Sequence, residues 1–395
     1  MKYKFIFLLF TSLIFGCSSE NKKYNKAATV IQNMVDVTSI AFNDSSYFEQ
    51  CRAIKLELSE ESLIGEVSQI EIFDNVIYIL DKKTVSLQVF DSTGKYIHSI
   101  GKRGEGPGEY SAINAFYLNS HNHTINMFDP LKLSVHKYDF NGNFIASVQF
   151  KDLILSQIVR ATPLDNGSLF CFTNPNWHPA SGYFIIREND YSIQEQIYLH
   201  PVPISAEISY SILNHPFVYY NKEVHYVSLF SNIIQSYTDG KNLPLYYIDN
   251  GKDENMNFLK SAAVETNGNY LHIIKKIIED NSYTVGFKNI FETDRYICVD
   301  FYGKNLLSLA FLLDKKTKTN YHIDKYMKYT PHFGSIVYSY GNTMVRVWQN
   351  ADIHIFKENL KSGEITNNYE NDFLELIEQY GEEDNPVLLL YTMLQ

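Results

Sequence analysis

The sequence predicts an all-β protein: a six-bladed β-propeller of four-stranded antiparallel blades with short helical insertions. Three observations support this prediction. An internal repeat follows the strand pattern of a propeller blade. The chain carries 30 Tyr and 26 Phe, residues that suit strands. Apolar strands also lie near both ends, where a closed ring needs them. We expect one folded body over residues 49–395, because single propellers reach this length.

The repeat is clearest in two segments that align without gaps. VIYILDKKTVSLQVFDSTGKYIHSI begins 48 residues before TINMFDPLKLSVHKYDFNGNFIASV. The aligned pairs are Asp81 with Asp129, Ser86 with Ser134, Asp91 with Asp139, Gly94 with Gly142 and Ile97 with Ile145. In segments 91–94 and 139–142 an aspartate can bond the backbone two residues on, and a glycine supplies a positive φ. These segments are therefore hairpin turns, and each copy is an antiparallel meander.

One further strand precedes each meander, at 66–73 and 111–118. The resulting four-stranded unit has the period of a propeller blade. Weaker copies follow at 168–190, 217–240, 296–323 and 334–349. Together the copies predict six blades.

Two stretches interrupt the strand pattern. Residues 269–280 carry apolar side chains at helical spacing, namely Leu271, Ile274, Ile277 and Ile278, and with 257–264 before them we expect a helical excursion between blades. In 372–381, Asp372 and Glu375 form the capping box of a second helix, which ends at Gly381. We expect both helices to face the core rather than to form a site.

Strands near the two ends predict how the ring closes. Residues 52–58 alternate strictly, with Ile54, Leu56 and Leu58 on one face, and the chain ends in the apolar strand 386–394. Pairing the first strand into the blade finished by the second would hide two free sheet edges. We therefore expect this pairing.

The first residues resemble a bacterial lipoprotein signal. Lys2 and Lys4 precede an apolar run, 5–15, that is much shorter than the roughly 20 residues needed to span a bilayer. Ile14-Phe15-Gly16-Cys17 resembles a lipobox, which implies acylation of Cys17; an ordinary cleaved signal is the alternative. We expect a signal peptide and lipobox at 1–17 and a tether or linker at 18–48. The lipid would hold the protein on a bacterial membrane in the cell envelope, and we expect this to be the outer membrane.

Charge and cysteine content exclude some classes of protein. The net charge of −11 offers no basic surface for nucleic acid. Besides Cys17, three cysteines remain at spacings that match no metal-binding pattern: Cys51, Cys171 and Cys298. We expect them to be small buried hydrophobes, although export would permit one disulfide.

The glycine-rich stretch GKRGEGPGEY, residues 101–110, lies between the outermost strand of one repeat and the innermost strand of the next. The chain must cross a face of the ring here, and glycines permit the backbone angles of such a crossing. A phosphate-binding loop is excluded, because the segment lacks the GxGxxG and GK[ST] patterns and leads into a strand. We expect a structural crossover whose charged residues could also contact a ligand.

Residues 77–110 resemble an NHL-type blade, with its Asp-led turn, its QVFD and glycine turn, and its glycine-rich crossover. GEGPGEY and the ending Asp384-Asn385-Pro386-Val387-Leu388 are similar to the six-bladed β-propeller lipoproteins of bacteria. The proline that follows the crossover in NHL blades is missing from 111–114, and the later blades depart freely from the NHL pattern. The resemblance implies a fold and an envelope location, but no reaction.

Candidate binding residues lie in two loops and one strand. Arg103 could grip a carboxylate or a sugar hydroxyl at two points. Glu105 and Glu109 could complement it, or could simply pair with it and hold the loop. Further candidates are Asn114 on a predicted innermost strand, and Trp177 and His178 as an aromatic lip for sugar or peptide. His121 and His123 are expected in a solvated turn, and Asp81 and Asp129 are expected to cap turns.

The sequence specifies no catalytic residue, cofactor or metal ligand set, since GxSxG, HExxH and EF-hand patterns are absent. The leading hypothesis is a membrane-anchored binding or scaffold module for a peptide, glycan or protein partner. The alternative is a metal-dependent hydrolase or lactonase of the six-bladed type. That enzyme would need three or more carboxylates or amides converging on the axis around a divalent cation, and Asn114 could belong to such a set.

Overall fold

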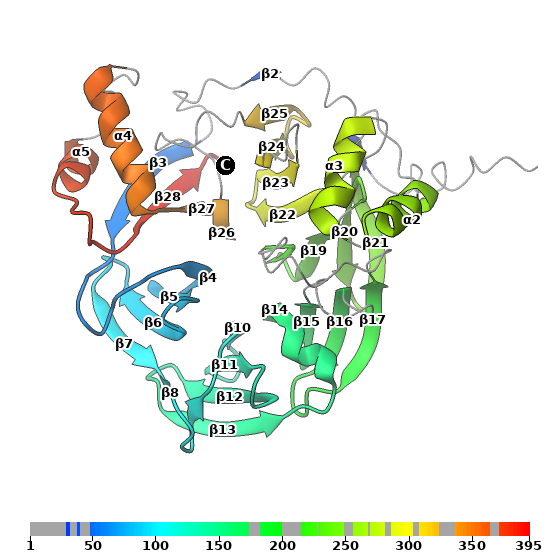
Figure 1. Ribbon diagram of the computed structural model, residues 1–395, viewed down its shortest axis with the longest axis horizontal. Coiled ribbons are helices and arrows are strands. Elements are labelled where there is room, and N and C mark those ends of the chain that lie inside the picture. Colours follow the sequence, from blue (N-terminus) through cyan, green and yellow to red (C-terminus); the bar gives the residue numbers. More distant parts are fainter. Residues whose placement is uncertain are drawn as a thin grey trace, which may run out of the picture.

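The computed structural model describes residues 29–31, 38–39, 48–173, 182–199, 215–228, 230–248, 256–267, 269–280, 286–302, 308–323, 336–363 and 371–395. Six sheets stand around a common centre and form the predicted six-bladed propeller (Figure 1). No helix in these ranges is long and apolar enough to cross a membrane.

Each blade is an up-and-down antiparallel sheet. The innermost strands are β4 (Val67–Phe73), β10 (Ala115–Asn119), β14 (Ile158–Pro163), β18 (Phe217–Tyr220), β22 (Phe287–Glu292) and β26 (Ile336–Tyr340). The second strands are β5 (Val76–Asp81), β11 (Thr124–Asp129), β15 (Ser168–Thr173), β19 (Glu223–Val227), β23 (Tyr296–Tyr302) and β27 (Thr343–Trp348). The third strands are β6 (Ser86–Asp91), β12 (Ser134–Asp139), β16 (Gly182–Arg187), β20 (Ile233–Thr238), β24 (Ser308–Asp314) and β28 (Val387–Met393). The fourth, outer strands are β7 (Tyr96–Ile100), β13 (Phe144–Gln149), β17 (Ile193–Leu199), β21 (Lys241–Ile248), β25 (Asn320–Ile323) and, in the sixth blade, β3 (Phe48–Lys55).

Ring closure is as predicted. β3 pairs antiparallel with β28, with Lys55 opposite Val387 and Cys51 opposite Tyr391. The strand lies at 48–55 rather than 52–58, because its partner begins only after Pro386, which has no N–H to extend the ladder. Leu56 beyond the strand is still fully buried, so the apolar alternation runs past the end of the pairing.

Two short strands lie in the segment 18–48, where we expected a linker. β1 (Thr29–Ile31) pairs parallel with β21, and β2 (Thr38–Ser39) pairs parallel with β25. They add a fifth, outer strand to the fourth and fifth blades.

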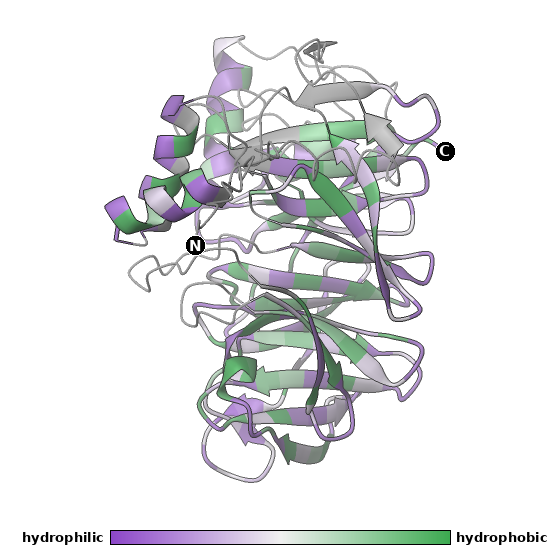
Figure 2. Cartoon of the chain, turned by 90° about the vertical axis from the view of Figure 1, so that its right-hand side faces the viewer, coloured by the Kyte–Doolittle hydropathy of each residue, from purple (hydrophilic) through white to green (hydrophobic). Residues whose placement is uncertain are grey.

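The two faces of the ring differ in their connections. On one, here called the turn face, first strands meet second strands and third strands meet fourth in short hairpins such as 74–75, 221–222 and 239–240. Asp74, Asn75, Asn221 and Lys222 have positive φ, as tight hairpins require. The other, the crossover face, carries longer connections such as 101–114 and 150–157. Figure 2 shows the helices gathered on one side of the ring.

Six apolar clusters form the core, each centred on the contact between neighbouring blades. The helices extend two of them. α2 (Met256–Glu265) and α3 (Tyr270–Asp280) bury Leu259, Ile273 and Ile277 against the third and fourth blades. α4 (Asn350–Ser362) and α5 (Asn371–Glu378) bury Phe356 and Phe373 beside the fifth and sixth blades. The two predicted helices are therefore core-facing; α4 was not predicted.

Cys171 and Cys298 are buried thiols in these clusters, as expected, while Cys51 is half-buried.

Candidate functional site

The crossover 101–114 forms a small, tightly held ribbon on the crossover face. β8 (Lys102–Arg103) and β9 (Glu109–Tyr110) pair in parallel. Gly108 has a φ of 74°, and a Cβ there would stand 2.6 Å from the ring of Phe144. The Tyr138 hydroxyl donates to the Gly108 carbonyl at 2.7 Å, and Lys132 Nζ donates to the carbonyl of Glu109 at 3.0 Å. The ribbon is thus anchored to the second blade, as a structural crossover should be.

The carboxylates of this ribbon are engaged by lysines. Glu109 accepts the Gly106 N–H at 2.8 Å and lies 2.9 Å from Lys102 Nζ, and these contacts lower the pKa of Glu109. Glu105 lies 3.6 Å from Lys132 Nζ. The pairing of Arg103 with either glutamate, which the sequence left open, is not found.

Arg103 is exposed and has no carboxylate partner in the part of the chain that the structure describes. It stands beside the buried ring of Tyr110: burial raises the pKa of Tyr110 to about 12, and the charge of Arg103 opposes that rise. The ribbon therefore presents one uncompensated guanidinium on a fixed backbone.

The remaining predicted residues do not join this site. Asn114 is exposed, and its side-chain amide donates to the carbonyl of Ser156 at 2.9 Å, which links two crossovers. Trp177 and His178 lie outside the described residues. His121 and His123 lie in the exposed turn at 120–123, as predicted.

The repeated aspartates cap turns, as predicted. Asp81 is fully buried and accepts the N–H groups of Gly65 at 2.7 Å and Lys83 at 2.8 Å. Asp129 holds the equivalent place and accepts from Ser111 at 2.6 Å and Leu131 at 2.9 Å. Each carboxylate joins a blade's second strand to the crossover that enters the blade.

A polar cluster that the sequence did not predict occupies the axis. Arg160 on β14 lies 3.2 Å from Glu71 on β4. The first and third blades are not neighbours, so a contact between their innermost strands must cross the centre of the ring. Gln69 donates to Glu71 at 3.1 Å and to the carbonyl of Phe116 at 2.8 Å, which brings in the second blade.

His215 completes the axial cluster from the start of the fourth blade. Its Nδ1 bonds the Ile290 carbonyl at 2.8 Å, and its backbone N–H donates to Asn289 at 2.9 Å. Burial, and then the nearby charge of Arg160, lower the pKa of His215 well below its usual value. The ring of Tyr338, from the sixth blade, lies 6.1 Å from the imidazole. The axis is therefore lined by polar side chains from several blades.

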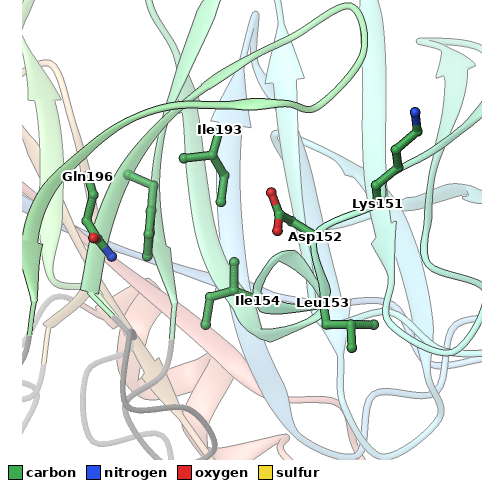
Figure 3. A pocket seen from close by; sticks show the side chains of 7 residues that line it. Lys151, Asp152, Leu153, Ile154, Ile193 and Gln196 are labelled. Atoms are coloured by element: carbon green, nitrogen blue, oxygen red, sulfur yellow. The ribbon is translucent and has the colours of Figure 1, made fainter.

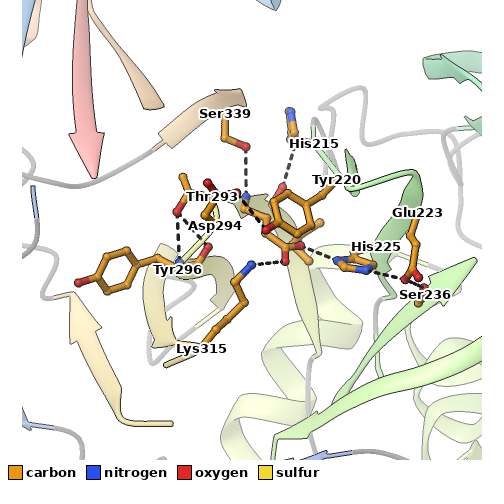
Figure 4. A network of polar contacts seen from close by, with 12 residues as sticks. His215, Tyr220, Glu223, His225, Ser236, Thr293, Asp294, Tyr296, Lys315 and Ser339 are labelled. Carbon is orange, nitrogen blue, oxygen red and sulfur yellow. Dashed lines mark hydrogen bonds and ion pairs between the residues drawn. The ribbon is translucent and has the colours of Figure 1, made fainter. Parts of the chain in front are cut away.

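A second polar network joins the fourth, fifth and sixth blades near the turn face (Figure 4). The carboxylate of Glu292, 2% exposed, lies 2.6 Å from His225 Nδ1 and 2.8 Å from Lys315 Nζ. The backbone N–H of Glu292 donates to the Ser339 hydroxyl at 3.1 Å. Glu223 lies 3.2 Å from the other imidazole nitrogen. Burial disfavours the imidazolium, but the two carboxylates outweigh it and raise the pKa of His225.

A cavity of about 420 Å³ lies at the third blade (Figure 3). It is open to solvent and lies between the 3₁₀ turn η2 (Leu153–Gln157), with the residues before it, and the third and fourth strands of the blade, β16 and β17. Its lining is mixed, with Lys151, Asp152, Leu153, Ile154, Phe184, Ile193 and Gln196. Apart from Lys151 and Asp152 it presents no charged side chain, so its lining suggests no reaction.

The described residues hold no group of three or more His, Cys, Asp or Glu that could bind a metal ion. At the axis the carboxylate of Glu71 is paired with Arg160, and Asn114 is bonded elsewhere. The side chains expected of a metal-dependent propeller enzyme are therefore not brought together in this part of the chain.

Comparison with known proteins agrees with the fold. BF0058 of Bacteroides fragilis NCTC 9343 has a similar structure, with a TM-score of 0.74 and 20% sequence identity, over 93% of this chain and 100% of that one. A member of the duf4221 family from Bacteroides vulgatus ATCC 8482 is similar at a TM-score of 0.52 and 11% identity, over 88% of this chain and 97% of that one. No curated protein matches the sequence.

The resemblance to NHL-type blades is not supported by these comparisons and stays a prediction. A different family matches instead, and it spans residues 29–392, which include all six blades. The chain therefore belongs to the DUF4934 family, described as a domain of unknown function.

Proposed function

We propose that the protein is a binding module of the cell envelope, anchored through a lipid on Cys17, and that its partner docks on the crossover face. The observation that carries this proposal is the exposed, uncompensated guanidinium of Arg103 on a rigid ribbon. Connections on a rigid ring can vary and recognise a partner while the sheets fix their positions.

The chemistry of the ribbon suggests what the partner offers. Lys102 and Lys132 are already matched by Glu109 and Glu105, so their charges are largely compensated. Arg103 keeps its planar fork of donors available, which suits a carboxylate gripped at two points. An acidic peptide segment or a uronic acid of a glycan would meet this requirement.

An envelope location is supported by the lipobox-like residues 14–17. It also agrees with the description of BF0058 as an exported protein.

The test is to measure binding of the Arg103→Ala variant to arrays of acidic peptides and of glycans with and without uronic acids. Lys95→Glu is the matched control, because Lys95 is exposed in the 92–95 hairpin of the turn face. Both variants should first be shown to melt like the parent. We expect Arg103→Ala to lose roughly 10- to 100-fold in affinity, as for a hydrogen-bonded charge, while Lys95→Glu keeps it. Equal binding by the parent and Arg103→Ala would leave the ribbon a purely structural element.

A further inference from the structure

Two buried polar atoms of the axial cluster have no hydrogen-bond partner: Nε2 of His215 and Nε of Arg160. His215 is 1% exposed and Arg160 is 7% exposed. Leaving a buried polar group unsatisfied costs about 1–3 kcal/mol, so folded proteins usually pair such groups. Two unsatisfied groups in one cluster point to a ligand that would complete them.

The hydrogen-bonding roles of the two atoms are opposite. A carbonyl oxygen can only accept, so Nδ1 of His215 carries the proton that it donates to Ile290. Burial and the charge of Arg160 keep the pKa of this imidazole low, and the ring is therefore neutral. Its Nε2 is then an acceptor without a donor. Nε of Arg160 is a donor without an acceptor.

A hydroxyl group meets both requirements, because its hydrogen can be donated while its oxygen accepts. We propose that the axis of the propeller binds a hydroxyl group of a neutral sugar or polyol, which donates to His215 Nε2 and accepts from Arg160 Nε. The Arg160 guanidinium packs over the ring of Phe217, two residues after His215, so the two side chains lie in the same part of the axis.

Charge selects a neutral ligand. Arg160 already faces Glu71 at 3.2 Å, so an added anion would meet the carboxylate and an added cation would meet the guanidinium. Aromatic rings of Phe217 and Tyr338 border the two residues, 5.6 Å from the guanidinium and 6.1 Å from the imidazole.

Solvent reaches this cluster, because the side chain of Glu71 is 19% exposed. The site is separate from Arg103 on the crossover ribbon, so this inference and the proposed function can fail independently.

The test is calorimetric titration of the folded protein with a panel of neutral monosaccharides and linear polyols, alongside the matching uronic acids. His215→Phe keeps a ring of similar size and removes the acceptor. His98→Phe is the matched control, because His98 also has a buried Nε2 without a partner but lies on the outer strand β7. Arg160→Lys is a second variant, which keeps the charge facing Glu71 and loses the Nε donor.

We expect saturable binding of at least one neutral compound to the parent, weaker binding of its uronic acid, and about a tenfold or greater loss in His215→Phe and Arg160→Lys. His98→Phe should bind like the parent. Absence of saturable binding to the folded parent would mean that the two atoms are satisfied by water only, which overturns the proposal. Undiminished binding by His215→Phe would overturn it as well.

Discussion

The most direct test of the ring closure is Asn385, one residue before the proline that precedes β28. Its side chain is fully buried and clamps the connection 56–66 that leads from β3 into the first blade. The side-chain amide donates to the carbonyls of Glu57 and Ser62, each at 2.7 Å, and its oxygen accepts the Ile64 N–H at 2.8 Å. Asn385 thus joins the last blade to the first independently of the β3–β28 ladder.

The expected cost of Asn385→Ala follows from these three bonds. Each buried hydrogen bond contributes about 1 kcal/mol net, so the loss is about 3 kcal/mol. Asn385→Asp should destabilise the protein further. It keeps the acceptor for Ile64 but removes both donated bonds and turns a buried carboxylate toward two carbonyl oxygens. Asp is closer to Asn than Ala is in size and polarity, so these two properties alone would predict that Asn385→Asp is the more stable variant.

The assay is equilibrium unfolding in urea, with the melting temperature as a second measurement. A loss of 3 kcal/mol lowers the melting temperature of a large domain by roughly 6 °C. Asn122→Ala is the control, because Asn122 is exposed in the turn at 120–123 and should change stability by less than about 0.5 kcal/mol. If Asn385→Asp unfolds at the urea concentration of the parent, the clamp contributes nothing and the reasoning fails.

Three further predictions concern the buried network, the anchor and the last strand. Glu292→Gln leaves the buried His225 and the partly buried Lys315 without their carboxylate and should cost about 3 kcal/mol in urea unfolding. Because Glu292 and Glu223 raise the pKa of His225, part of this stabilisation is fully present below the unfolded pKa of about 6.5. That part is lost as the pH rises through the folded pKa, so the gap between parent and variant should narrow toward pH 8; a constant gap would contradict the assignment. Cys17→Ser should release the protein from the membrane fraction and abolish labelling by a fatty-acid probe, and unchanged fractionation would refute the anchor. Deleting residues 386–395 removes β28 and exposes the edges of β3 and β27, so the protein should aggregate or lose cooperative unfolding; a truncated chain that melts near the parent temperature would speak against the closure.

The repeat made the blades predictable from the sequence. Turn chemistry and strand alternation are local, so Asp91, Gly94 and their copies 48 residues later could be interpreted without knowing what packs against them. The buried aspartates were likewise predictable, since Asp81 and Asp129 hold the same place in the repeat. The ends of the strands were less predictable. Leu56 is buried and so continues the apolar alternation of the strand, although the ladder has already ended at Lys55.

The axial cluster could not be predicted in the same way. Gln69, Glu71, Arg160 and His215 come from three blades and share no spacing, so their meeting depends on the closed ring. One feature of the sequence did indicate part of the axial cluster. Innermost strands are packed on both faces, so polar residues such as Gln69 and Glu71 within 66–73 are out of place there. The alternation of that strand concealed them, because it also fits a strand with one face in solvent.

These buried polar contacts also bear on how six similar sheets take one order. Apolar burial is non-directional, so the clusters between blades do little to distinguish one neighbour from another. Polar contacts do distinguish them: Gln69 reaches Phe116 of the second blade, and Asn385 reaches from the sixth blade to the connection before the first. Likewise His225 of the fourth blade meets Glu292 of the fifth. A blade in the wrong place would leave these groups buried without partners, at several kcal/mol each for the charged ones. We therefore infer that the polar residues around the axis and the turn face specify the order of the blades, which leaves the connections on the crossover face free to differ in length.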